Sequence, residues 1–291
     1  MIVDVHTHIP THVEPVPENE EVYNDIMRPD TTVRLSHSFS DFHNAMVDVD
    51  MAIAFGIAAN PHGGERVEGA MKEHTSINDI ASNLANTYPD KVIGFMSVHP
   101  DDPHVIDEMD RCVNKLDLKG MKLAPNYQNF EPMSSSALEV YSYAEQNKLP
   151  ILFHQGTGIM RTAPLRYTHP LVMDEIAMLF PDLKIIMAHM GHPWNEDCIT
   201  VIRKHPNVYA DVSGLFYRPW QMYNGMRLAY EWSVFHKLLF GSDWPLTTPT
   251  DTINHLRGMV TFAKKHNLPG FPNTAFEEII NRETLSLLGL T

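Results

Sequence analysis

The sequence predicts an α/β protein folded as one (β/α)₈ barrel of the TIM type, and three observations support this prediction. Short apolar runs alternate with longer stretches of helical periodicity, the pattern of repeated βα units around a parallel sheet. Eight such pairs follow one another along the chain. The 291 residues suit a single barrel of about 250 residues with insertions. One domain spanning residues 1–291 is therefore expected.

Each expected strand is short and rich in aliphatic residues, as strands buried on both faces should be. Strands are expected at residues 2–6, 51–57, 92–98, 119–123, 150–154, 184–188, 208–211 and 237–241. Helices are expected at residues 40–49, 76–88, 103–116, 134–147, 170–180, 195–204, 221–235 and 250–266. Ser134 and Asp251 are suitable cap or first-turn residues for two of these helices.

Two segments lie outside the eight pairs. Residues 9–39 follow the first strand, lack clear periodicity and contain four prolines. Long irregular loops at that end of a barrel can cover the active site, and a purely structural excursion is the alternative. An extra helix at about residues 274–288 is expected to pack outside the barrel. No repeat or linker indicates a second domain.

Composition excludes several classes of protein. The net charge of −14 and the absence of basic runs argue against a nucleic-acid partner, which needs clustered Lys and Arg. Two cysteines, Cys112 and Cys198, exclude a disulfide framework. The chain opens on a strand rather than a leader, and no apolar run of about 18 residues follows. A cytoplasmic protein with no membrane partner is expected.

Histidine is abundant, with 17 residues, and two of them close the first expected strand. His6 and His8 are two residues apart, so both side chains should project from the same side of the strand. Two imidazoles on one face form half of a site for zinc, manganese or a similar ion. Alone, such a pair is weak evidence.

Three further polar residues close other expected strands. His154 ends the fifth strand, His189 follows the sixth and Asp243 follows the eighth. Taken singly, each histidine could be a core residue bonded to the backbone, and the aspartate could cap a helix. A barrel brings all these strand ends around one mouth, where catalytic groups are found. Three histidines and an aspartate would then form a metal shell with an open position.

These residues and their order resemble the amidohydrolase superfamily, within it the branch containing aminocarboxymuconate-semialdehyde decarboxylase and uncharacterised metal-dependent hydrolases. The resemblance spans nearly the whole chain. Its motifs are DVHTHIP at residues 4–10, GMKLAP at 120–125, LPILFHQG at 149–156, PDLKIIMAHMG at 181–191, NVYADVSG at 207–214 and LLFGSDWP at 238–245. Together they are specific for the superfamily and less so for the reaction.

The resemblance implies a divalent transition-metal cofactor, with zinc favoured over manganese or iron. The ligands would be His6, His8, His154 and Asp243, and the catalytic residues His189 and Asp243. In superfamily members with two metals, a carboxylated lysine on the fourth strand bridges both ions, and Lys122 occupies that place here. One metal is favoured, with Lys122 contacting a substrate carboxylate. A second metal bridged by Lys122 is the alternative.

The favoured function is metal-dependent hydrolysis of a small, carboxylate-bearing ester, lactone or amide. The cation would lower the pKa of a bound water to about 7, Asp243 would take its proton and His189 would stabilise the developing oxyanion. The alternative is non-oxidative decarboxylation of a small unsaturated or aromatic acid with the same ligands. A remote alternative is an inactive ligand-binding barrel, but such a chain should have lost a ligand, and none is lost.

Candidate substrate contacts follow the later strands. A guanidinium suits a carboxylate, and the candidates are Arg161, Arg166 and Arg218. Aromatic residues could line a pocket for a ring, and the candidates are Trp194, Phe216, Tyr217 and Trp220. Lys122 and the turn His192-Pro-Trp194-Asn-Glu196 depart from the decarboxylase pattern and favour a hydrolase. A homodimer is the expected assembly.

Overall fold

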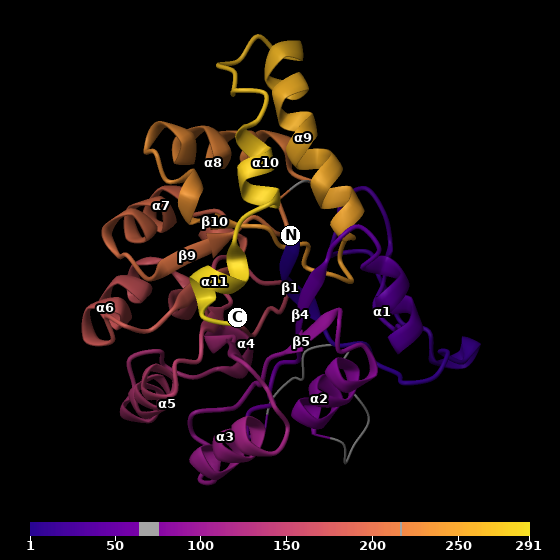
Figure 1. Cartoon of the computed structure of the whole chain (residues 1–291), viewed down its shortest axis with the longest axis vertical. Coiled ribbons are helices and arrows are strands. Elements are labelled where there is room, and N and C mark those ends of the chain that lie inside the picture. The colour runs from indigo at the N-terminus through magenta and orange to yellow at the C-terminus, as the bar shows by residue number, and fades with distance from the viewer. Residues whose placement is uncertain (64–75, 216) are drawn as a thin grey trace.

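The computed structural model describes residues 1–63, 76–215 and 217–291, and these residues form the expected barrel (Figure 1). The barrel strands are β1 (Val3–His8), β4 (Met51–Phe55), β5 (Val92–Gly94), β6 (Met121–Leu123), β7 (Ile151–Phe153), β8 (Ile185–Met187), β9 (Val208–Asp211) and β10 (Leu238–Leu239). Neighbours pair in the orders β1-β4-β5 and β6-β7-β8-β9-β10, and every pair is parallel.

Two sets of contacts close these sheets into one barrel. A parallel bridge between Met96 and Met121 joins the chain after β5 to β6. On the other side, Val5 donates its backbone N–H to the carbonyl of Phe240 at 3.0 Å, and Thr7 bridges Trp244. Closure brings the carboxyl ends of all eight strands to one mouth. The predicted (β/α)₈ barrel is thus confirmed.

The main helices form a ring around these strands (Figure 1). They are α1 (Phe39–Ala45), α2 (Ile77–Thr87), α3 (Val105–Asn114), α5 (Ser135–Gln146), α6 (Leu171–Leu179), α7 (Asn195–Lys204), α8 (Pro219–Glu231) and α9 (Pro249–Lys265). Ser134 caps α5 by accepting from the Ala137 amide, and Asp251 lies in the first turn of α9, where its amide donates to the cap residue Thr248, so both predictions are confirmed. Among the described residues, no helix has both the length and the apolar character needed to cross a membrane.

Several one-turn elements were not predicted from the sequence. They are α4 (Pro125–Gln128), η1 (Glu18–Glu20), η2 (Leu165–Thr168), η3 (Ala188–Gly191) and η4 (Phe235–Lys237). The strand expected at residues 237–241 is only two residues long. Its first expected residue, Lys237, belongs to η4, and the ammonium of Lys237 binds the carbonyl of His205. Segments of one turn carry too little hydrophobic periodicity to be recognised.

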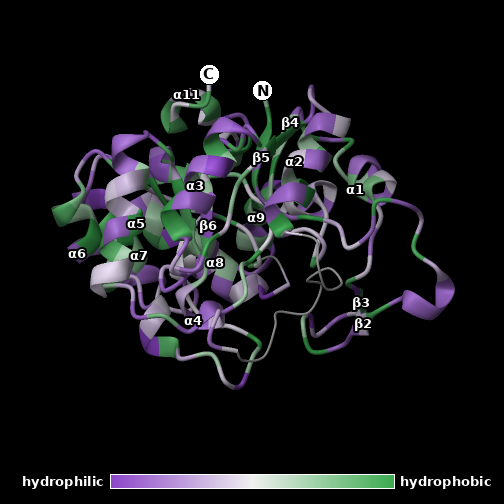
Figure 2. Ribbon diagram, turned by 90° about the horizontal axis from the view of Figure 1, so that it is seen from below, coloured by the Kyte–Doolittle hydropathy of each residue, from purple (hydrophilic) through white to green (hydrophobic). Residues whose placement is uncertain are grey.

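The strap, as we call residues 9–39, crosses the mouth of the barrel. It contains the short antiparallel pair β2 (Tyr23–Asn24) and β3 (Val33–Arg34), which lies on the side of the molecule away from both termini (Figure 2). Met27, Val33 and Leu35 pack together with Leu246 as a small separate core. The strap is therefore neither fully irregular nor independent of the barrel.

The C-terminal segment differs from its prediction. The helix expected at residues 274–288 is two helices, α10 (Ala275–Ile280) and α11 (Thr284–Leu288). Helix α11 does not pack on the outer ring, because Leu288 is buried among inward-facing strand residues such as Val3 and Leu239. Figure 1 shows α11 in front of the strands, and Figure 2 places it beside the N-terminus. It closes the end of the barrel opposite the mouth.

Candidate metal centre

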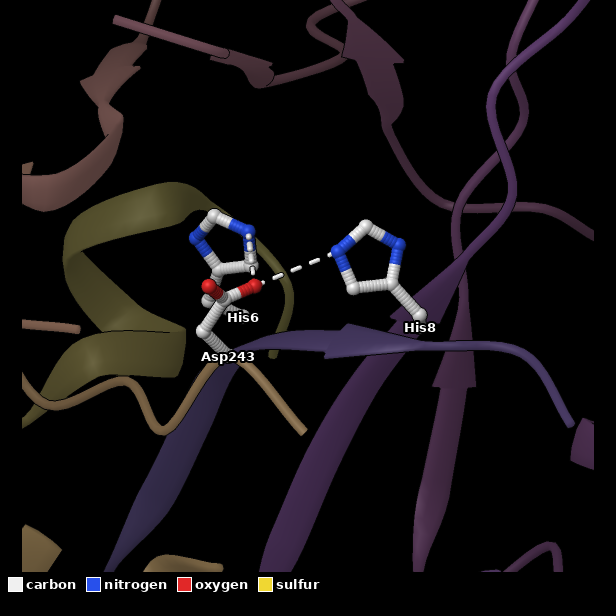
Figure 3. Close-up of side chains that lie close together, drawn as sticks. All are labelled: His6, His8 and Asp243. Atoms are coloured by element: carbon white, nitrogen blue, oxygen red, sulfur yellow. Dashed lines mark hydrogen bonds and ion pairs between the residues drawn. The ribbon is translucent and has the colours of Figure 1, made fainter. Parts of the chain in front are cut away.

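Three of the proposed ligands meet at the mouth (Figure 3). His6 and His8 project from the end of β1, and Asp243 follows β10. The Oδ1 atom of Asp243 lies 3.3 Å from Nε2 of His6 and 3.2 Å from Nε2 of His8. One ligand atom from each residue lies within 4.8 Å of the others. This spacing is compatible with one shared cation.

Backbone contacts hold this group in place. Asp243 donates its N–H to the carbonyl of His6 at 2.8 Å. Beneath them, the buried carboxylate oxygen Oδ1 of Asp4 accepts from the amides of His6 at 3.0 Å and Ser242 at 2.9 Å. The end of β1 and the chain after β10 are thus fixed relative to each other, as a metal shell requires.

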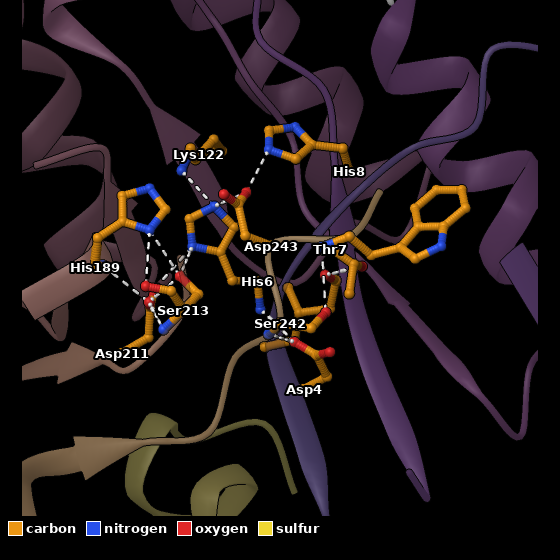
Figure 4. A network of polar contacts seen from close by, with 12 residues as sticks. Asp4, His6, Thr7, His8, Lys122, His189, Asp211, Ser213, Ser242 and Asp243 are labelled. Carbon is orange, nitrogen blue, oxygen red and sulfur yellow. Dashed lines mark hydrogen bonds and ion pairs between the residues drawn. The ribbon is translucent and has the colours of Figure 1, made fainter. Parts of the chain in front are cut away.

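Asp211, at the end of β9, orients His6 (Figure 4). Its Oδ2 lies 2.8 Å from Nδ1 of His6, and such a carboxylate directs the opposite nitrogen, Nε2, toward the metal position. Burial, together with the charge of Lys122, lowers the pKa of His6 to about 4, so its ring is neutral as a ligand must be. The sequence analysis gave Asp211 no role, although it closes a buried strand as His154 does.

His154 is the next candidate for a residue that binds the metal. It is 6% exposed, it follows β7, and its Nε2 is buried with no hydrogen-bond partner. Burial first, and then the charges of His189 and Lys122, hold its pKa well below the usual value. A neutral imidazole whose Nε2 is unpartnered, and which lines the same cavity as His6, fits a metal ligand. The ring of Tyr127 packs beside it, with centroids 4.7 Å apart.

His189 lies on the other side of His6, with ring centroids 4.8 Å apart. Its Nδ1 is 2.8 Å from the hydroxyl of Ser213, and its backbone N–H donates to Asp211 at 3.0 Å (Figure 4). Gly214 is required behind it, since a Cβ there would lie 3.0 Å from Nδ1 and φ is +70°. These contacts leave Nε2 of His189 for a substrate in the cavity.

Lys122, the central residue of β6, is buried inside the group. Its ammonium lies 3.4 Å from Nε2 of His6 and 4.7 Å from the centroid of the Phe55 ring. Burial lowers the pKa of Lys122 to about 8, although the charges of Asp211 and Asp243 oppose this shift. The lysine thus lies close enough to contact either a metal ligand or a substrate.

A second group of residues could hold a metal ion, and it overlaps the first. It consists of His6, His189 and Asp211. It shares His6, and Asp211 already binds the Nδ1 atom of that ring. The carboxylate therefore acts as the hydrogen-bond partner of a ligand. This group therefore does not form a second metal site separate from the first.

A cavity of about 140 Å³ opens above these side chains. His8, His154, His189, Lys122 and Asp243 all line it. The structure does not bring the candidate substrate contacts Arg161, Arg166, Trp194 and Arg218 to its described lining.

The candidate contacts lie elsewhere. Arg161 and Arg166 are exposed, and Arg218 lies 4.4 Å from the Tyr217 ring. Trp194 packs against His169 with centroids 4.9 Å apart. Trp220 is 62% exposed, and Phe216 lies outside the described residues.

Comparison with known proteins identifies the class. A family model described as amidohydrolase (Amidohydro_2) matches residues 3–264. The chain belongs to this family, a class of enzymes, and the resemblance inferred from the motifs is confirmed.

Solved structures share the fold over the whole chain. An uncharacterised TIM-barrel protein from Bordetella bronchiseptica is 20% identical, with a TM-score of 0.72 and coverage of 99% of this chain and 98% of that one. A probable 2-pyrone-4,6-dicarboxylic acid hydrolase from Acinetobacter baumannii is 15% identical, with a TM-score of 0.64 and 99% coverage of both chains. The 5-carboxyvanillate decarboxylase from Sphingomonas paucimobilis is 13% identical, with a TM-score of 0.65 and coverage of 100% and 99%.

Proposed function

We propose that the chain is a hydrolase that holds one divalent cation through His6, His8, His154 and Asp243. The main support is the convergence of Asp243 on two imidazole nitrogens, with the unpartnered Nε2 of His154 lining the same cavity. Three imidazoles and a carboxylate suit zinc, manganese or iron. Structures with this fold include one with bound manganese, from Polaromonas, and one with bound zinc, from Burkholderia multivorans.

The substrate would be a small, carboxylate-bearing ester, lactone or amide. The cation, when bound, would supply Lewis acidity and make water a nucleophile at neutral pH. Burial would raise the pKa of Asp243, but the nearby histidines, His6 above all, lower it overall, so its carboxylate is ionised. It can take a proton from the attacking water and pass it to the leaving group. His189, held at Nδ1, can stabilise the developing negative oxygen through Nε2.

Decarboxylation is the second candidate, and the apolar wall of the cavity, which shields a carboxylate at the metal end from water, favours it. A carboxylate removed from water loses carbon dioxide more readily than a hydrated one. The bond between the carboxyl carbon and its neighbour would break, and the electron pair left on the neighbour would take a proton from His189. Structures with this fold include two named as 2,6-dihydroxybenzoate decarboxylases.

A cytoplasmic homodimer remains a prediction from the sequence.

One isotope experiment separates the two reactions. The metal-loaded enzyme is incubated with a panel of carboxylate-bearing lactones and esters, and with unsaturated and aromatic acids, in H₂¹⁸O and in D₂O. Hydrolysis puts ¹⁸O into the product acid, whereas decarboxylation releases carbon dioxide and puts deuterium on carbon. Both proposals expect the substitution Asp243→Asn to lower turnover by at least ~10²-fold with the fold intact. The exposed Asp182→Asn serves as the control, and a fully active Asp243→Asn enzyme would refute this mechanism.

A further inference from the structure

The cavity has two chemically different ends. The metal ligands, His189 and Lys122 lie at the barrel end. The strap contributes Ile9, Met27 and Leu35 to the lining, together with Thr11, whose hydroxyl donates to the carbonyl of His37 at 3.2 Å. Other loops add Ile159 and Leu246. Met27 and Leu35 are themselves buried, 8% and 7% exposed, and are supported by their own small core. The apolar wall is thus a fixed part of the structure.

Among the described lining residues, lysine and arginine are confined to the barrel end. Within the described part of the chain, Lys122 is the only lysine or arginine that lines the cavity. Arg28 of the strap approaches the outer wall, but its guanidinium binds Asp30 through Nε at 2.9 Å and contacts the Leu246 carbonyl at 3.4 Å. The described part of the wall therefore offers a ligand neither a lysine nor an arginine of its own.

This distribution determines where a substrate can carry charge. A carboxylate next to Lys122 exchanges its water for an ammonium and for the proposed cation. A second carboxylate at the outer end would lose water against Met27 and Leu35 and, among the described lining residues, would meet no lysine or arginine in exchange, which is unfavourable. An apolar group at that end gains from the same contacts.

We propose that the substrate is a small amphipathic monoacid, and this proposal rests on the function proposed above. Its carboxylate lies beside the reacting bond near Lys122, and its apolar body lies against the strap, where Met27 and Leu35 determine specificity. Acids with a second carboxylate at the far end bind more weakly. The strap thus selects the substrate as well as covering the mouth.

A matched pair of ligands tests this inference. The zinc-loaded protein is titrated by calorimetry with 4-methylbenzoate and with terephthalate, which differ only in having a methyl or a carboxylate at the far end. We expect 4-methylbenzoate to bind at least ~10-fold more tightly. Binding requires no turnover, so the result is independent of which reaction is catalysed. Equal or tighter binding of terephthalate, or no binding of either acid, would overturn the proposal.

Substitutions then locate the selectivity. Ile159 lines the cavity and is 37% exposed, so Ile159→Arg adds a cation to the wall with little risk to folding. This variant should bind terephthalate at least ~10-fold more tightly than the parent protein does. Ile26→Arg is the control, because Ile26 belongs to the strap but is 67% exposed and lies off the cavity. Unchanged terephthalate binding in Ile159→Arg, or the same gain in Ile26→Arg, would contradict the proposed wall.

Discussion

His189 and Asp243 have left-handed backbone conformations, with φ of 57° and 66°. Such conformations cost about 1–3 kcal/mol for a non-glycine residue, and they persist where surrounding contacts determine them. Here the amide of Asp243 donates to His6, and that of His189 donates to Asp211. Both residues proposed to carry the chemistry therefore have a strained backbone, a property they share with several other residues such as Met190 and Asn129.

Asp211 gives the first prediction at this scale. Asp211→Asn would place an amide where Oδ2 now faces Nδ1 of His6, and so would disturb the orientation of that ligand. We expect metal affinity to fall by roughly 10- to 100-fold with little change in fold. Competition with a chelator measures this affinity. The control is Asp197→Asn, which removes a carboxylate 3.4 Å from His169, away from the cavity. Equal affinities in the two variants would exclude a supporting role for Asp211.

Asp4 gives a prediction on pH. In the metal-free protein, burial raises the pKa of Asp4 from 3.8 to about 7, against its hydrogen bonds with Ser242 and His6. The folded state therefore keeps this proton after the unfolded chain has lost it. The resulting stabilisation is complete below pH 3.8 and is lost as the pH rises through about 7.

Asp4→Asn removes this dependence. Relative to the parent, the variant should gain up to roughly 4 kcal/mol in free energy of unfolding between pH 4 and pH 7. Urea unfolding in the presence of a chelator measures both proteins at each pH. The exposed Asp90→Asn should follow the parent curve. Parallel curves for Asp4→Asn and the parent would show that the pKa of Asp4 is not raised.

The sequence predicted the proposed metal ligands better than the residues that hydrogen-bond to them. His6 and His8 share a strand face, and Asp243 follows the last strand, so barrel closure alone brings them together. The roles of Asp211 and Ser213 depend on the register of β8 against β9, where Met187 pairs with Ala210. Local residue patterns do not contain that register.

At the scale of elements, the strap and α11 close opposite ends of the barrel. The strap packs Met27 and Leu35 over the mouth, and α11 inserts Leu288 at the other end. The sequence indicated that both segments exist but not where their apolar residues pack. Each is too short or too irregular for a periodic pattern, and its position is determined by the apolar surface that the barrel leaves uncovered.

The role of α11 can be tested separately from the chemistry. Leu288 is 1% exposed, and Leu288→Ala should lower the free energy of unfolding by about 2 kcal/mol or more. The Michaelis constant should not change, because the cavity lies at the other end. The control is Leu171→Ala, because the Leu171 side chain is 48% exposed. This substitution should change the free energy of unfolding by less than about 0.5 kcal/mol, and urea unfolding measures both variants. Equal stabilities would mean that α11 does not seal the barrel.

At the scale of the whole molecule, the alternation of strands and helices was sufficient to predict the barrel. The same topology accommodates many reactions, so it could not identify the reaction. The candidate arginines illustrate this limit: they follow the later strands, yet Arg161 and Arg166 are exposed and Arg218 contacts Tyr217. Part of the apolar wall of the cavity comes instead from the strap, whose residues 9–39 showed no periodic pattern.

The central claim is a single metal ion at the mouth, and elemental analysis of the purified protein tests it most directly. We expect about one equivalent of zinc, manganese or iron per chain, which is lost when His6 and His8 are both replaced by Ala. It should be retained when the exposed His104 and His236 are replaced. No metal after reconstitution, two equivalents, or full occupancy in the variant lacking His6 and His8 would contradict the account.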